Sequence, residues 1–237
     1  MQSAGPNLNV IFEDSDVIVV EKSAGVPSQG DKTGDKDMVY IVSEYLSGKN
    51  PDKEPYAALI HRLDRTIGGV MVFGKNKDAA AELSYDLLNG NFDKTYLAVV
   101  CGKAKKDLTL RDYLVKNERL NYSRVAPKNT PGAREALLSY ELINRIDTEK
   151  DGALSLISIK LFTGRHHQIR VQLSNAKTPI WGDMKYNEKA AKPSQTGGFV
   201  FAALWAYKLK FKHPKTGKEM EFETKPHGQY PFTLFFE

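Results

Sequence analysis

The chain has 237 residues, 41% of them hydrophobic and 27% charged, which suits a globular protein with enough core for one large domain or two small ones. It contains no apolar run of about 18 residues and no visible signal-peptide pattern, so no membrane-spanning helix is expected. Cys101 is the only cysteine, so internal disulfides and cysteine metal sites are excluded and a cytoplasmic protein is expected, while the net charge of +5 favours polyanionic partners mildly.

Short apolar runs and helical stripes predict the elements of the first half of the chain. Strands are expected over residues 8–12 and 17–21, and a helix with apolar side chains at helical spacing is expected to end near Gly48. Two β-branched runs, 57–60 and 70–73, are typical of buried strands. A helix over residues 78–89 follows, with Asp78 as its N-cap and Gly90 just past its end.

The second half of the chain is richer in strands than in helices. Strands are predicted over residues 94–101, 134–143, 154–161, 199–211 and 220–222, and one helix over residues 164–175. Because strands and helices do not alternate regularly, the pattern indicates an α+β fold with a mixed, mostly antiparallel sheet and flanking helices. No linker or repeat marks a boundary, so residues 1–237 are predicted to form a single domain.

A first polar string, His61-Arg62-Leu63-Asp64-Arg65, lies between the two buried strands 57–60 and 70–73. Catalytic groups are commonly displayed on such connections, because the strands hold them rigidly. The neighbouring arginines favour an ionised Asp64, which could act as a nucleophile or a base. The alternative is a surface ion pair of little energetic value.

A second string, Thr163-Gly164-Arg165-His166-His167-Gln168-Ile169-Arg170, concentrates hydrogen-bond donors. This set suits an anion or the edge of a nucleobase. Neighbouring residues of a regular helix or strand point to different sides, so His166 and His167 are expected to make a poor metal pair. No metal site is expected in the chain.

The stretch from residue 102 to residue 134 holds nine lysines and arginines against three acids, an excess of six positive charges. One interpretation is a set of mobile, solvated loops, which is the commoner fate of such runs. The other is an electrostatic track for nucleic acid, with Lys103, Lys105 and Lys106 at its start.

Several strings occur in the order found in one enzyme family. They are residues 13–27 with Lys22 and Ala24-Gly25, residues 61–69 around Asp64, Lys94-Thr95-Tyr96-Leu97-Ala98, residues 163–170, and Pro179-Ile180-Trp181-Gly182-Asp183 with Tyr186. Over residues 10–207 the chain resembles the RluA-type pseudouridine synthases. It departs from the family pattern at Ser23, where proline is usual, at Ile67-Gly68, where Thr-Ser is usual, and at His166, where threonine is common.

The resemblance implies the pseudouridine synthase fold and the isomerisation of uridine to pseudouridine in ribosomal or transfer RNA. It implies that Asp64 attacks the substrate or abstracts a ribose proton. Tyr96 would stack on uracil and help to remove the proton from the new bond, and Arg170 would hold the Asp64 carboxylate. The isomerisation needs no cofactor and no metal.

The resemblance also bears on the RNA partner. The residues expected to contact RNA are His61, Arg62, Arg65, Arg165, Gln168, Lys103, Lys105 and Lys106. Arg62 would fill the gap left by a flipped uridine. The chain is expected to be a short form, a monomer without the small N-terminal RNA-binding S4 domain that many relatives carry.

Two other functions fit parts of the sequence. One is a catalytically silent RNA-binding protein on the same fold, although such a protein would not need Asp64, Tyr96 and Arg170 together. The other is a glycoside hydrolase that pairs Asp64 with a second carboxylate, for which Asp183 is the obvious candidate.

Overall fold

The computed structural model describes residues 8–187 and 201–236 apart from residues 32 and 53. The chain divides into two compact units. Unit 1 consists of Met1–Asp93 and Ala206–Lys225, and unit 2 consists of Lys94–Trp205 and Pro226–Glu237. The single domain expected from the sequence therefore stays a prediction.

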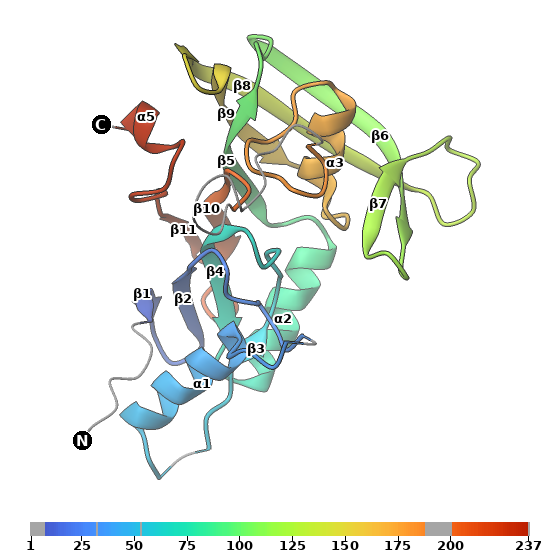
Figure 1. The fold of residues 1–237 in the computed structure, drawn as a ribbon. Coiled ribbons are helices and arrows are strands. Elements are labelled where there is room, and N and C mark those ends of the chain that lie inside the picture. Colours follow the sequence, from blue (N-terminus) through green and yellow to red (C-terminus); the bar gives the residue numbers. More distant parts are fainter. Residues whose placement is uncertain (1–7, 32, 53, 188–200, 237) are drawn as a thin grey trace. The chain divides into compact units, whose positions relative to one another are not determined.

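Unit 1 is built on a sheet in which β1, β2, β4 and β10 are successive neighbours (Figure 1). The strand β3 adds to β4, and β11 adds to β10. The pairs β1–β2, β2–β4, β3–β4 and β10–β11 are antiparallel. The strands are β1 (Asn9–Glu13), β2 (Val17–Lys22), β3 (Ala58–Leu59), β4 (Gly68–Gly74), β10 (Leu204–Lys212), of which all but the first two residues belong to unit 1, and β11 (Glu219–Glu223).

Both faces of the central strands of unit 1 are covered, since Val17 to Val20 are buried without interruption. One face packs in a cluster with Leu83 of α2 (Lys77–Leu88), and α1 (Met38–Lys49) buries its own stripe of Met38, Val42 and Leu46. The sequence-based N-cap of α2 is wrong. Asn76 caps the helix, because its side chain accepts the N–H of Ala79 at 2.9 Å, and Asp78 lies within the first turn.

Gly69 fixes the spacing between β4 and β10. Its φ is +128°, and a Cβ built there would lie 2.3 Å from the backbone oxygen of Ala206. A side chain would therefore push the two strands apart. The glycine that follows the Asp64 string is thus required by packing within unit 1.

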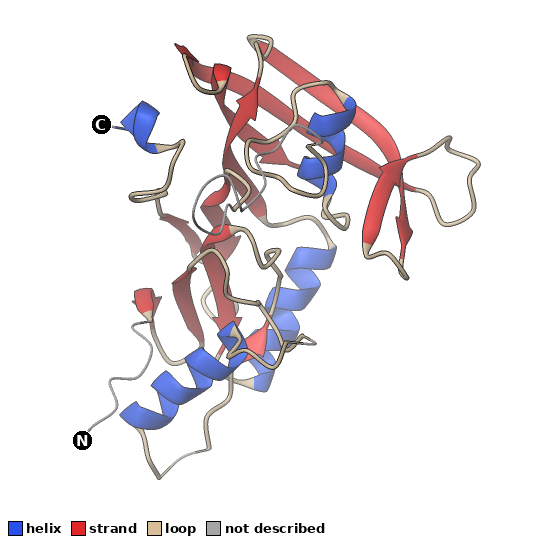
Figure 2. Ribbon diagram, viewed as in Figure 1, coloured by secondary structure: helices blue, strands red, loops and turns tan. Residues whose placement is uncertain are grey.

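Unit 2 contains a second set of strands in the order β5-β9-β8-β6-β7, with all four pairs antiparallel (Figure 2). Its elements are β5 (Asp93–Cys101), β6 (Asp107–Asn117), β7 (Tyr122–Val125), β8 (Arg134–Thr148), β9 (Gly152–Leu161), α3 (Gln168–Asn175) and the short α5 (Thr233–Phe236). The predicted α+β class with a mostly antiparallel sheet is confirmed. Residues 199 and 200 of the predicted late strand lie outside the described residues.

The basic stretch 102–134 is only partly a set of loops. Nearly half of it forms β6 and β7, which pair as a hairpin with Asn117 opposite Tyr122. The side chains of β6 alternate between exposed and partly buried from Asp107 to Arg111, the pattern of a half-buried strand. A count of the charges over this stretch does not reveal the alternation.

The helix expected over residues 164–175 begins only at Gln168. His167 precedes it with a φ of +54°, a left-handed conformation that continues no helix. Among the helices that the structure describes, none is both long and apolar enough to cross a membrane.

Candidate active site

The loop that carries Asp64 is fastened to the segment after β2. Ser28 Oγ donates to the carbonyl of Leu63 at 2.7 Å and accepts the N–H of Leu63 at 3.1 Å. The N–H of Gly25 donates to the carbonyl of Arg65 at 2.7 Å. Within the loop, the N–H of Ile67 donates to the carbonyl of Asp64 at 2.9 Å. Backbone bonds on both sides of Asp64 therefore fix the place from which its partly exposed side chain projects.

Lys22 is the buried support of this loop. Its side chain has no exposure to solvent, and Nζ donates to the carbonyls of Ile67 (2.6 Å), Ser23 (3.1 Å) and Arg65 (3.3 Å). Burial lowers the pKa of Lys22 to about 7. The three carbonyls match the three N–H donors of an ammonium group, the form that Lys22 takes below this pKa.

We expect Lys22 to make the stability of the protein depend on pH. An unfolded lysine keeps its proton up to about 10.5, whereas folded Lys22 loses it near 7, so the unfolded chain binds more protons between these values. The free energy of unfolding should therefore rise with pH across this window, by up to about 1.4 kcal/mol per pH unit. Urea denaturation of the wild type and of Lys22→Met at pH 7, 8 and 9 measures this slope. Equal slopes for the two proteins would contradict it.

The other residues of the first string have separate surroundings. Arg62 is exposed, and its contact with RNA stays a prediction. His61 Nε2 accepts the N–H of Val72 at 3.2 Å. Arg65 binds the loop that follows Gly30, because its side chain donates to the carbonyl of Gly25 and pairs with Asp31 and Asp35. Hydrogen bonding to Asp35 raises the pKa of Arg65. To bind the Arg65 side chain, an RNA phosphate would have to displace Asp31 and Asp35.

Arg170 lies on α3 and is buried against Asp183. Nε donates to Oδ2 of Asp183 at 2.7 Å and one terminal nitrogen donates to Oδ1 at 2.8 Å, which is the two-pronged geometry of a strong guanidinium–carboxylate pair. Oδ1 of Asp183 also accepts the N–H groups of Lys185 and Tyr186. A carboxylate that is only 1% exposed and holds four donors is poorly suited to serve as the second acid of a glycoside hydrolase.

The remaining part of the second string is supported by Gln168, which is only 3% exposed. Its Oε1 accepts from Thr163 Oγ1 at 2.8 Å and from the N–H of Arg165 at 3.0 Å, while Nε2 donates to the carbonyl of Leu137 at 3.1 Å. The expected RNA contact of Gln168 is therefore not supported, because these partners occupy its amide inside unit 2. Arg165 is half-buried, and its Nε donates to the carbonyl of Glu135.

His166 and His167 do not point to different sides. Their rings stack with centroids 3.7 Å apart, because the left-handed conformation of His167 removes the alternation of a regular element. Both rings are hydrogen-bonded to protein groups: His166 to Ser123 and Asn121, and His167 to Tyr186. The absence of a metal site stays a prediction. Among the described residues one group could hold an ion, and it consists of Asp14, Asp16 and His213 in unit 1.

Tyr96 is 9% exposed on β5, where it pairs with Ile159 of β9. Tyr96 and Arg170 belong to unit 2, whereas Asp64 belongs to unit 1. The assembly of these three residues in one site therefore stays a prediction. Lys103, Lys105 and Lys106 are exposed in the connection between β5 and β6.

Three supporting residues were missed from the sequence as functional groups. Lys22 had a signal, because a lysine that ends an apolar strand and precedes Ala24-Gly25 is placed for burial beside a turn. The sequence presents Asp183 only as part of a motif or as a candidate hydrolase acid, and Tyr186 only as part of that motif. Their roles depend on contacts across 13 to 63 residues of chain, which spacing does not reveal.

Known proteins resemble this chain over most of its length. The family model for RNA pseudouridylate synthase matches residues 16–175. An uncharacterized RNA pseudouridine synthase of Aquifex aeolicus is 32% identical over 91% of this chain and 68% of its own. The ribosomal large subunit pseudouridine synthase D of Xanthomonas campestris is 31% identical over 89% of this chain and 63% of its own. The chain thus spans about two thirds of the length of these relatives.

Solved structures show the same fold. Human RNA pseudouridylate synthase domain containing 4 superposes with a TM-score of 0.77 at 20% identity, covering 92% of this chain and 89% of that protein. Human RNA pseudouridylate synthase domain containing 1 gives a TM-score of 0.75 at 21% identity. With the family model covering the strings around Asp64, Tyr96 and Arg170, the chain belongs to the RluA-type RNA pseudouridine synthases, the isomerases that convert uridine to pseudouridine in RNA.

Proposed function

We propose that the chain isomerises a uridine of ribosomal RNA, acting as a cytoplasmic monomer without a cofactor. The observation that carries the proposal is the Asp64 loop, which is fixed by Ser28, Gly25 and Lys22 and leaves the carboxylate partly exposed. The names of relatives such as the large subunit synthase of Xanthomonas campestris favour ribosomal over transfer RNA. A uridine within folded RNA has to leave the stack, and exposed Arg62 is placed to fill its position.

The reaction breaks the bond between ribose C1′ and uracil N1 and forms a bond between C1′ and C5. The proton on C5 is lost and N1 gains one, so substrate and product are isomers. Asp64 either attacks the sugar or removes a ribose proton, and both roles need an ionised carboxylate. The Tyr96 hydroxyl takes part in removing the C5 proton, and Arg170 orients Asp64.

The test is the formation of pseudouridine in RNA by purified protein. Large subunit rRNA and tRNA from a strain that lacks the gene are incubated separately with the protein in excess chelator. Nucleoside analysis should find one new pseudouridine site in rRNA and none in tRNA. Binding without product would favour the silent RNA-binding protein. Activity lost in chelator while the RNA stays folded, and restored only by Mg²⁺ or Zn²⁺, would contradict the metal-free reaction.

The basic stretch is proposed as an RNA contact outside the predicted catalytic residues. Each phosphate contact from lysine releases counterions, so replacing Lys103, Lys105 and Lys106 together by alanine should weaken RNA binding. It should also flatten the dependence of log K on log salt by about one unit per lost contact. The turnover rate at saturating RNA should barely change. A filter-binding titration from 50 to 200 mM salt, roughly the range over which such contacts are lost, measures the slope. An unchanged slope would show that these lysines are only solvated.

A further inference from the structure

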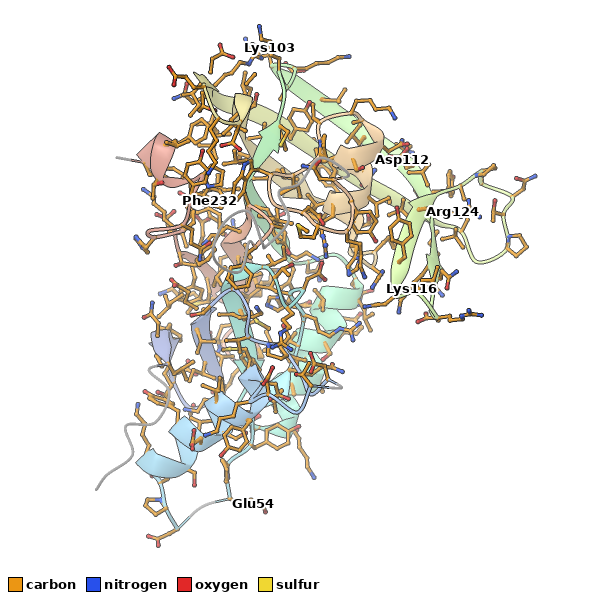
Figure 3. The ribbon with its side chains drawn as sticks, viewed as in Figure 1. Glu54, Lys103, Asp112, Lys116, Arg124 and Phe232 are labelled. Carbon is orange, nitrogen blue, oxygen red and sulfur yellow. The ribbon has the colours of Figure 1, made fainter. Side chains whose placement is uncertain are left out.

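The hairpin of β6 and β7 is fastened to the string that carries Arg170, and both belong to unit 2. Figure 3 shows Lys116 and Arg124 on this hairpin, far along β6 from Lys103. We call the fastening the hairpin latch. It consists of Asn121, Tyr122 and Ser123 on the hairpin, His166 and His167 on the string, and Tyr186.

His166 forms one half of the latch. Its Nδ1 lies 2.8 Å from Ser123 Oγ, and its Nε2 lies 2.9 Å from Asn121 Oδ1. The hairpin turn is held a second time by Lys185, whose Nζ donates to the carbonyl of Asn121 at 2.8 Å. The turn is therefore fixed from the string and from the segment that contains Asp183.

Tyr186 forms the other half and is only 6% exposed. Its hydroxyl oxygen accepts the N–H of Ser123 at 2.9 Å and lies 2.7 Å from Nδ1 of His167. Burial raises the pKa of Tyr186 to about 12, so the hydroxyl keeps the proton that it can donate to His167. The ring stacks on Tyr122 with centroids 4.7 Å apart.

The same tyrosine contacts Arg170. The guanidinium carbon lies 5.1 Å from the centre of the Tyr186 ring, and the N–H of Tyr186 donates to the Asp183 oxygen that also binds Arg170. One buried side chain thus touches the hairpin and the predicted catalytic arginine. A displacement of the hairpin would therefore move Arg170 as well, because close-packed side chains have little free space between them.

The exposed side chains of the hairpin suit RNA. Lys116, Arg119 and Arg124 are exposed and supply positive charge, and Leu120 at the turn is 63% exposed. An apolar side chain flanked by cations can contact bases while the cations bind phosphates.

We propose that Tyr186 is a positioning residue that couples RNA contact at the hairpin to the placement of Arg170. Binding energy from the hairpin then raises the turnover rate as well as the affinity, as expected when remote contacts organise a reacting centre. The inference rests on the proposed function, because it needs RNA as the substrate.

A double-mutant cycle between Arg119→Ala and Tyr186→Phe tests the coupling. Tyr186→Phe keeps the ring but removes the hydroxyl, and it should lower kcat by about tenfold while changing RNA affinity less than about twofold. Arg119→Ala should lower both kcat and affinity in the wild type. In the Tyr186→Phe background it should lower affinity alone. If the two substitutions lower kcat independently, their effects multiply in the double variant. That result in an active enzyme would overturn the inference and leave the proposed function intact.

Two controls complete the experiment. Lys150→Ala removes one positive charge in the turn between β8 and β9, outside the latch, and should change neither kcat nor affinity in either background. Hydrogen exchange at the Ser123 amide should accelerate in Tyr186→Phe, because its acceptor is lost; unchanged exchange would overturn the latch. If Tyr186→Phe does not fold, His166→Ala takes its place in the cycle. Absence of product with the wild type would refute the proposed function and the inference together.

Discussion

Asp64→Asn is expected to abolish pseudouridine formation while RNA binding persists. Asparagine has nearly the same shape, but it is neither a nucleophile nor a base at neutral pH. Turnover should fall by more than about 10³-fold, the upper range for loss of an essential proton-transfer or nucleophilic group. Nucleoside analysis after single-turnover incubation measures the residual rate, and filter binding measures the affinity.

Asp52→Asn is the matched control, because it makes the same change in an exposed turn of unit 1. It should leave turnover and affinity as in the wild type. Product formed by Asp64→Asn at more than about a tenth of the wild-type rate would assign the chemistry to another residue. If Asp64→Asn loses RNA affinity while Asp52→Asn keeps it, Asp64 instead has a role in binding.

Arg170→Ala is expected to cost both activity and stability. The change leaves the Asp183 carboxylate buried without its guanidinium partner, which should lower the free energy of unfolding by roughly 3–5 kcal/mol. Turnover should fall by about 10²-fold or more, because a misplaced reacting group loses the benefit of fixed orientation. Urea denaturation and single-turnover kinetics measure the two effects.

Replacing Asp183, the partner of Arg170, separates the effect on activity from the effect on stability. Asp183→Asn keeps Arg170 and most hydrogen bonds but removes the charge that holds the guanidinium. It should reduce turnover less than Arg170→Ala does, and added guanidinium ion should rescue part of the activity of Arg170→Ala only. A stable Arg170→Ala protein with wild-type turnover would contradict the role proposed for this arginine.

Local patterns determined much of this protein. Residues 17–21 and 70–73 are short, largely apolar runs rich in β-branched residues, which are typical of buried strands, and they form β2 and β4 with nearly the expected bounds. The order of the charged strings identified the family, because the reaction dictates which residue types those strings contain. The stripe of Ala79 and Leu83 likewise determined α2, although its cap is Asn76.

Tertiary structure decided what surrounds each charge. Arg65 pairs with Asp31 and Asp35, Arg170 with Asp183, and Lys22 with the carbonyls of Arg65 and Ile67, and none of these partners is near in sequence. The left-handed His167 joined two rings that a regular element would separate. Composition and periodicity reveal which side chains gain free energy from burial. That preference is a property of each residue and its near neighbours in the sequence. Ion pairs and hydrogen bonds depend on which distant groups meet after the chain has packed, so only the folded chain selects them.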